Sequence, residues 1–155
     1  IGFGQGFQPV CGFNYGAGLY DRVKQGFWFC VKFGSLFLLV VAVVGIASAP
    51  EIVRLFRKED AEVVRIGAAA LRFQLATMPL TTWVIISNMM LQTIRKPGKA
   101  ILLASAKQGL FFIPLIFLLT ANFGLLGVEI SQPAADLCAL ALAIPLTTRV
   151  LRKMK

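Results

Sequence analysis

Long apolar runs separated by short charged clusters dominate the pattern along this chain. Residues 27–49 form a run of about twenty residues, the length that a helix needs to cross ~30 Å of hydrocarbon. Runs of similar length cover residues 73–94, 100–122 and 125–148. Residues 1–18 are apolar and rich in glycine and precede charged residues, which is typical of the inner end of one more membrane helix. The pattern predicts an all-α fold, a polytopic membrane helix bundle.

Prolines and charges divide these runs. Pro50 is expected to end the first long span, with residues 51–56 forming an interfacial turn. Asp60 followed by Glu62 predicts a helix start that continues into the next span, and residues 51–72 are expected to be a solvated surface. Pro79 and Pro114 lie inside spans, where a proline kinks a helix if neighbours satisfy the freed carbonyl group.

Glycines recur at helical spacing in the first segment. Gly2 and Gly6 are four residues apart, as are Gly12 and Gly16, so we expect small residues on one face that let a neighbouring helix approach closely. A glycine-rich turn between two helices is the alternative. The chain has no initiator methionine and opens inside an apolar helix, so we interpret it as the C-terminal part of a longer chain.

Composition supports a membrane protein. The 155 residues are 57% hydrophobic and 15% charged, against roughly 25% charged in ordinary soluble domains. The net charge of +9 does not follow one soluble face, so we expect no nucleic-acid partner. If residues 19–32 form a cytoplasmic loop and the later loops alternate between the two sides, eleven of the sixteen Lys and Arg residues lie on the cytoplasmic side. This bias predicts that the C-terminus is cytoplasmic.

Several kinds of chemistry are absent from the sequence. Cys11, Cys30 and Cys138 are far apart and form no CxxC pair, so we interpret them as small packing residues. The chain contains no histidine, which argues against the usual zinc sites and against histidine-based catalysis. No nucleophile with a base, phosphate-binding loop or paired catalytic carboxylates is recognisable. We therefore expect neither an enzyme nor a bound cofactor or metal.

Two carboxylates fall within a predicted span. Asp136 lies roughly 16 Å along its helix from Leu125, near the middle of the membrane. A charged aspartate there costs about 2.5–3.5 kcal/mol and by default marks an ion or substrate pathway. Glu129 and Gln132 share its helical face, so the three predict a site. In the alternative, Asp136 only hydrogen-bonds to a neighbouring helix.

A polar stripe runs along the predicted span of residues 73–94. Gln74, Thr81, Asn88 and Gln92 share one helical face, which we expect to line the pathway or a protein contact rather than lipid. Each of these polar residues could instead only bond between helices. Lys107 lies about 10 Å into its helix, and its stem is long enough to reach back to the inner interface.

The opening segment also carries a specific motif. Residues 2–18 read GFGQGFQPVCGFNYGAG and are followed by Arg22. This resembles the pattern GxGQGxQPxxGxNYGAG, with a later arginine, at the end of the eighth helix in bacterial transporters of the multidrug and toxic compound extrusion family (MATE). The likeness extends along the chain through Phe56 with Lys58-Glu59-Asp60, Pro79 with Leu91-Gln92, Gly98-Lys99-Ala100, Lys107-Gln108 with Ile113-Pro114-Leu115, Gly124-Leu125-Leu126-Gly127, and Pro133-Ala134-Ala135-Asp136.

The resemblance implies part of the C-terminal six-helix lobe of a twelve-helix transporter. Such proteins are secondary active antiporters that export small amphipathic, often cationic drugs or toxins in exchange for protons or sodium, by rocking of two lobes. The sodium site of one branch is in doubt, because the region of Thr81 and Thr82 has no carboxylate. Without its partner, the missing N-terminal lobe, this segment is not expected to transport. The alternatives are a lipid-linked saccharide flippase of the same superfamily and a structural membrane subunit.

Overall fold

The computed structural model describes residues 2–56 and 60–154, which form seven consecutive helical segments. These are α1 (Gly2–Gly16), α2 (Tyr20–Phe56), α3 (Ala61–Thr93), α4 (Pro97–Ser105), the π-helical segment η1 (Ala106–Leu110), α5 (Phe112–Phe123) and α6 (Leu125–Lys153). The described residues contain no strand, so the predicted all-α class is confirmed.

Membrane-length helices make up most of this structure. Within the described ranges, four stretches are long and apolar enough to cross a membrane: Tyr20–Phe56, Ala61–Thr93, Pro97–Phe123 and Leu125–Lys153. Much of their apolar surface is exposed, including Phe37 and Phe117, which are 62% and 73% exposed. Apolar patches of this extent are rare on soluble monomers, whereas lipid covers them in a membrane. The structure thus confirms a polytopic membrane bundle.

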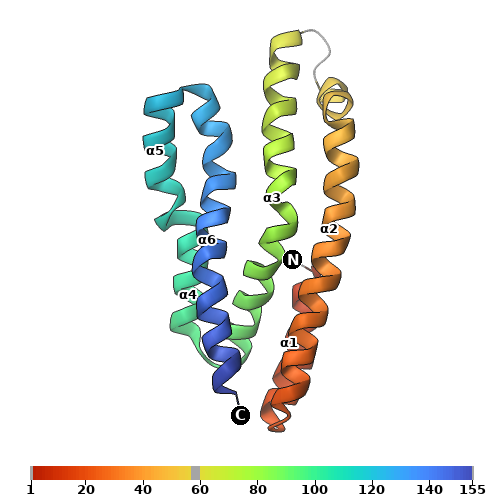
Figure 1. The fold of residues 1–155 in the computed structure, drawn as a ribbon, viewed down its shortest axis with the longest axis vertical. Coiled ribbons are helices and arrows are strands. Elements are labelled where there is room, and N and C mark those ends of the chain that lie inside the picture. Colours follow the sequence, from red (N-terminus) through yellow and green to blue (C-terminus); the bar gives the residue numbers. More distant parts are fainter. Residues whose placement is uncertain (1, 57–59, 155) are drawn as a thin grey trace.

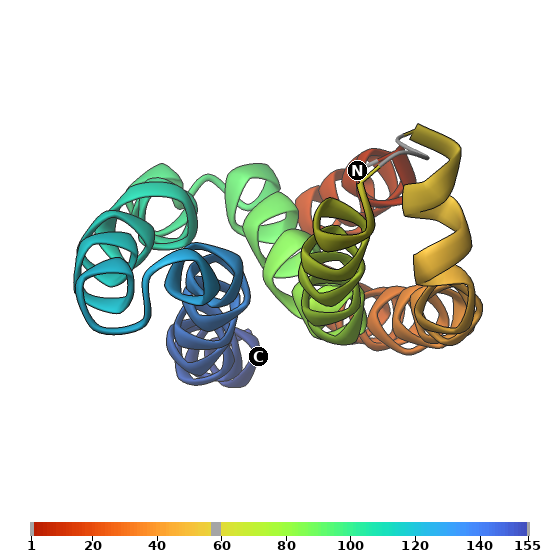
Figure 2. The same cartoon turned by 90° about the horizontal axis from the view of Figure 1, so that it is seen from above.

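The helices run side by side around α3. Figure 1 shows α2 and α3 together in one part of the bundle and α4, α5 and α6 in the other. Seen from above, α3 lies between these two parts (Figure 2), and it contacts α1, α2, α4 and α6. The turn between α1 and α2, the turn between α3 and α4 and the C-terminal end of α6 lie at one end of the molecule (Figure 1).

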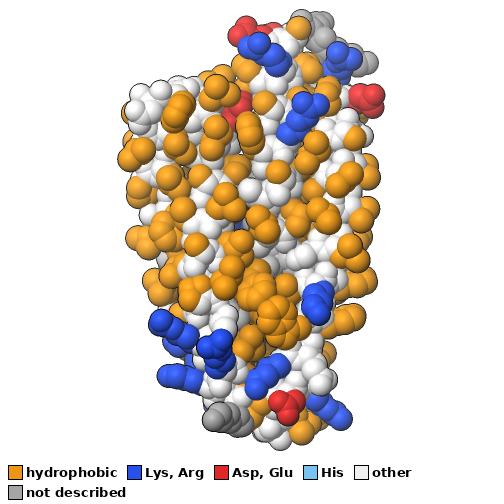
Figure 3. Space-filling model, viewed as in Figure 1, with side chains coloured by type: hydrophobic (Ala, Val, Ile, Leu, Met, Phe, Trp, Pro, Cys, Tyr) orange, Lys and Arg blue, Asp and Glu red, His pale blue; other side chains and the backbone are white. Residues whose placement is uncertain are grey.

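Charged side chains gather at the two ends and leave an apolar belt between them. In the face shown in Figure 3, lysines and arginines dominate the end that holds the C-terminus, whereas the opposite end carries both signs. Arg57, Lys58, Glu59 and Lys155, which enter the predicted charge count, lie outside the described residues. Among the described residues, the turn between α1 and α2, the turn between α3 and α4 and the C-terminal end of α6 thus lie at the more basic end.

Pro50 does not end the second helix, contrary to the prediction. α2 continues through it to Phe56, and Figure 2 shows its last turns lying across the direction of the rest of the helix. A proline cannot donate to the carbonyl four residues earlier, here that of Ile46. Arg72 of α3 supplies that bond, with its Nε donating to the Ile46 oxygen at 3.4 Å. A bond from another helix thus lets a bent helix persist where the sequence suggested a stop.

Asp60 begins the third helix as predicted. Its Oδ1 accepts the backbone N–H groups of Glu62 and Val63 at 3.1 and 3.4 Å, the bonding of an N-cap residue. α3 then runs without a break for 33 residues to Thr93. Pro79 lies inside it, and the later half of α3 leaves the axis of the first half in Figure 2.

The glycines of α1 pack differently from the prediction. A Cβ atom on Gly2, Gly6 or Gly16 would meet nothing within 4 Å, whereas on Gly12 it would lie 3.1 Å from Thr93 Cγ2. The face that contacts α3 includes Gly4, where a Cβ would lie 3.4 Å from Ile85 and Met89. Spacing within one helix identifies candidate faces, but the neighbouring helix decides which face is used.

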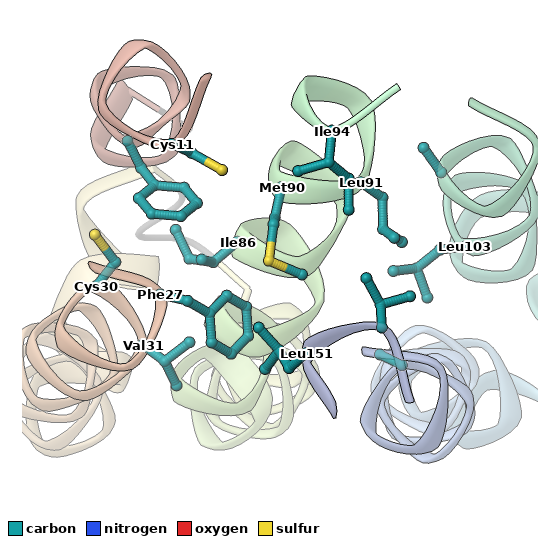
Figure 4. Packing of buried hydrophobic residues seen from close by; sticks show 14 of the residues in the cluster. Cys11, Phe27, Cys30, Val31, Ile86, Met90, Leu91, Ile94, Leu103 and Leu151 are labelled. Atoms are coloured by element: carbon teal, nitrogen blue, oxygen red, sulfur yellow. The ribbon is translucent and has the colours of Figure 1, made fainter. Parts of the chain in front are cut away.

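A hydrophobic core lies toward the end of the bundle that contains α1 and the C-terminus. Figure 4 shows side chains from five helices meeting there, with Phe27, Ile86, Met90 and Leu103 among the fully buried ones. Cys11 and Cys30 belong to this core, as the packing interpretation predicts, and the three cysteines are free thiols. The core joins α1, α2 and α3 to α4 and α6.

Candidate functional site

Asp136 is a buried carboxylate with a charged partner. Its side chain is 3% exposed, and Lys107 Nζ lies 3.6 Å from its Oδ1. Gln132, one turn earlier on α6, donates through Nε2 to the same oxygen at 3.4 Å. Burial of an unpaired carboxylate is costly, and the ammonium of Lys107 supplies a counter-charge for Asp136. The predicted Asp136–Gln132 face of α6 is therefore a polar contact with another helical segment.

The position of Lys107 differs from the sequence interpretation. Its side chain does not reach back to the inner interface but points to α6, and 24% of it is exposed. Lys107 lies in η1, where Phe111 N–H bonds to the Ala106 oxygen five residues back. Pro114 follows closely and has no N–H for the Leu110 carbonyl. The wider π turn changes the phase of the helix, which an ideal 3.6-residue pattern does not anticipate.

Glu129 is the second carboxylate of the predicted site. Both of its carboxylate oxygens are covered by protein and have no hydrogen-bond partner among the described residues. It shares a helix with Gln132 and Asp136, yet only these two are bonded to each other. A buried polar atom without a hydrogen-bond partner is destabilising.

The polar residues of α3 separate into two groups. Asn88 donates through Nδ2 to the Ala100 oxygen of α4 at 3.0 Å and accepts a hydrogen bond from Gln92 Nε2. Thr81 is buried and bonds within its own helix, to the Met78 oxygen at 2.7 Å. Gln74 at the other end of the stripe is exposed. The Asn88–Gln92 pair thus links α3 to α4, and Thr81 lies apart from it.

A cavity connects Asn88 with Lys107. The α3–η1 cavity has a volume of about 270 Å³ and opens between α3 and the segment around η1. Three polar side chains line it: Asn88, Lys107 and Gln108. The rest of the lining is apolar and consists of Val84, Ile85, Met89, Leu103 and Ala104. Asp136 does not line the cavity, but Lys107 touches both. The structure therefore brings residues of the α3 stripe and of the α6 carboxylate site to the two sides of one lysine.

Sequence reasoning did not identify this lysine as a site residue, nor Gln108 beside it. Position 107 is a charged residue inside a span and shares the membrane with few other charges. Counting the charges within the predicted spans gives two lysines, Lys32 near the end of its span and Lys107, together with two carboxylates. Pairing opposite charges in a low-dielectric region would have suggested a contact between Lys107 and one of the carboxylates. The choice of Asp136 over Glu129 depends on helix packing and had no signal in the sequence.

Comparison with known proteins identifies the family. The model of the MatE family matches residues 1–118. No curated protein matches the chain. Three solved structures are similar over nearly its whole length: a multidrug resistance MATE family transporter of the MOP superfamily in the outward-facing conformation, one in the inward-facing conformation, and the Vibrio cholerae MATE transporter VcmN in the bent form.

These likenesses are strong in fold and low in sequence. The TM-scores are 0.89, 0.91 and 0.85, at identities of 19%, 18% and 19%. The matches cover 97%, 99% and 95% of this chain but only 34%, 36% and 33% of the respective transporter chains. The chain thus spans about a third of the length of these structures. With the opening motif and a family match over more than two thirds of its residues, the chain belongs to the MatE family of membrane transporters.

Proposed function

We propose that the chain is part of a secondary active antiporter that exports small amphipathic, often cationic compounds in exchange for protons or sodium. The observation that carries this proposal is the buried carboxylate of Asp136, paired with Lys107 beside the α3–η1 cavity. An ionisable pair deep in a membrane helix bundle is expensive to maintain, and such pairs typically serve ion or substrate movement. Asn88 and Gln108 add polar groups to the cavity wall.

Alternating access would come from rocking of this unit against the rest of the transporter. The chain matches an inward-facing and an outward-facing relative about equally well, with TM-scores of 0.91 and 0.89. The arrangement of these helices is thus compatible with both conformations. This supports a cycle in which the helices keep their mutual packing and the opening and closing occur at a boundary with other helices.

We also propose a bacterial cytoplasmic membrane location with the C-terminus in the cytoplasm. The end of the molecule that holds the C-terminus is the strongly basic one, which fits the positive-inside bias (Figure 3). A green fluorescent protein fused after residue 155 should therefore fluoresce, and alkaline phosphatase fused there should be inactive. Active phosphatase at this position would reverse the proposed orientation.

Ethidium efflux tests the proposed function. Cells that express the full-length protein should extrude the dye. The two gradients are collapsed in turn, and efflux should stop when the gradient of the coupling ion, protons or sodium, is lost. Asp136→Asn should lower the efflux rate at least tenfold with unchanged abundance in the membrane. Asp21→Asn is the matched control, because Asp21 is 94% exposed and its ion pair, with Lys24 at 3.9 Å, lies outside the proposed site.

The outcomes separate the candidate functions. Gradient-dependent efflux that needs Asp136 supports the antiporter and identifies the coupling ion. A well-expressed wild type that moves no dye under any gradient contradicts the proposal and favours the lipid-linked saccharide flippase or the structural subunit. Normal efflux by Asp136→Asn would remove Asp136 from the pathway and leave Glu129 as the remaining carboxylate.

A further inference from the structure

We propose that Lys107 is a tethered counter-ion of Asp136, and that a transported organic monocation entering the α3–η1 cavity displaces it. This inference rests on the proposed transport function and assigns a specific exchange to its site. The bound state of the carboxylate then alternates between the ammonium of Lys107 and the positive charge of the substrate. Lys107 and the substrate are competitors for one anion.

The contact between the two side chains is loose enough to exchange. Tight charge-assisted N–H···O bonds measure about 2.7–2.9 Å, whereas Lys107 Nζ lies 3.6 Å from Asp136 Oδ1. The second bond to this carboxylate, from Gln132, is also long at 3.4 Å and ends on the same oxygen. Asp136 is therefore held by two weak contacts and not by a bidentate clamp.

Lys107 lies between the cavity and the carboxylate. About a quarter of its side chain is exposed and lines the cavity, while the Asp136 side chain is nearly inaccessible behind it. A cation in the cavity can approach Asp136 only after the ammonium has moved aside. The apolar part of the cavity wall, with Met89 and Leu103, suits a cation that carries apolar substituents.

The backbone around Lys107 offers a way to move it. Lys107 belongs to η1, one π-helical turn between two α-helical segments. A change of one residue in helical register rotates a side chain by roughly 100° about the helix axis. Loss of the π turn would thus turn Lys107 away from α6, and Pro114 already prevents one of the α-helical bonds that would hold this region rigid.

Charge stays balanced during the exchange. When the monocation reaches Asp136, it replaces one positive charge with another, so the buried carboxylate is not left without a counter-charge. The displaced ammonium can move to the polar edge of the cavity near Asn88 and Gln108. When the substrate leaves, Lys107 returns to Asp136, which hinders rebinding and thereby aids release.

Binding of tetraethylammonium to the purified full-length protein tests this inference by titration calorimetry. The Lys107→Gln variant lacks the competing ammonium and should bind the probe about tenfold more tightly than the wild type. Its ethidium efflux should be slower, because release of the substrate is impaired. Lys107→Arg restores a tethered cation and should reverse most of that gain. Lys24→Gln breaks the pair with the exposed Asp21, away from the cavity, and is the control that should leave the affinity unchanged.

The double variant Lys107→Gln/Asp136→Asn distinguishes exchange from a purely structural pair. If the pair only stabilises the fold, removal of both charges should restore the efflux that each single variant reduces. Exchange instead requires the carboxylate, so the double variant should be folded and inactive. Recovery of efflux in the double variant, or unchanged affinity in a folded Lys107→Gln, would overturn the inference.

Amine acylation of the wild type gives a reading that needs no variant. Saturating tetraethylammonium should raise acylation of Lys107 at least threefold, measured by mass spectrometry relative to Lys99 in the same sample. No rise, or no binding of the probe, contradicts the exchange. If the exchange fails in this way, dye efflux by the same preparation would show that the transporter assignment still stands. A positive acylation result without efflux would instead contradict only the proposed transport.

Discussion

The two helical hairpins of this chain differ in how their helices pack and in the polar groups that they bury. The first hairpin, α2 with α3, consists of two long helices that pack through small residues and aromatic rings, including Trp28 and Trp83 with ring centres 5.2 Å apart. The second runs from α4 to α6 and contains a π turn and the buried Lys107–Asp136 pair. We call the first hairpin the frame, and the second contains the ion pair of the proposed site.

Packing density follows the same division. In the first hairpin, a Cβ on Gly45 would lie 2.6 Å from Leu75 Cδ1, so the Leu75 side chain of α3 packs directly over this glycine of α2. In the second, α5 has no buried residue, while α6 has many, including Ser131 and Thr147. Close packing of small residues fixes helix spacing, whereas the broken helix leaves room for a cavity and a movable charge. Variants that disturb each hairpin should therefore differ in what they lose.

Gly127→Ala should have the largest effect, because Gly127 lies where α6 packs against the backbone of α5 in the second hairpin. A Cβ there would lie 2.1 Å from the Leu119 oxygen and 2.6 Å from Thr120 N, which are backbone atoms that cannot move aside. We expect a loss above the roughly 1–3 kcal/mol typical of overpacking, seen as loss of folded protein in the membrane. Fluorescence-detected size-exclusion chromatography of the full-length protein measures it. Gly98→Ala, where a Cβ would meet nothing within 4 Å, is the control and should be abundant.

Gly34→Ala tests the frame and should have a smaller effect. The added Cβ would lie 2.8 Å from Thr82 Cγ2 on α3, a side-chain atom that can yield partly. We expect a loss of about 1–3 kcal/mol, measured as a lower midpoint of thermal unfolding in detergent. The dye affinity of the protein that remains folded should not change.

Thr82→Ser provides the matched compensation for Gly34→Ala. Serine lacks the Cγ2 atom that meets the new methyl group, so the double variant should recover most of the lost stability. Recovery assigns the loss to this single contact between α2 and α3. If the double variant is no more stable than Gly34→Ala, the helices do not meet at these two residues.

The contrast between the hairpins also explains what the sequence could predict. The lengths of the apolar runs predicted four membrane-length helices, and Asp60 predicted the start of α3, because both signals are local. The persistence of α2 beyond Pro50 depends on Arg72 of another helix, which no local pattern contains. The family resemblance of the opening motif was confirmed by the family match, since that motif is long and specific.

For the candidate site, local patterns predicted the burial of Asp136 but not its partner. The distance from the helix start places a residue in the membrane, and Asp136 is indeed nearly fully buried. Its contact with Lys107 depends on the phase shift of η1 and on the packing of η1 against α6. Neither is encoded in the spacing of one helix, and for the same reason only Gly12 of the four predicted α1 glycines packs closely against α3.

Asp60→Ala should have the smallest effect and the most local one. Asp60 Oδ1 caps the N–H groups of Glu62 and Val63, and loss of such a cap costs about 1 kcal/mol. Hydrogen exchange of the full-length protein should accelerate about fivefold at these two amides, while the core amide of Met90 stays protected. Asp60→Asn keeps an oxygen acceptor and should exchange like the wild type. Because the first turn of α3 is far along the helix from the core and from Lys107, dye efflux should persist in both variants; a loss of efflux would mean that the frame and the site are coupled through α3.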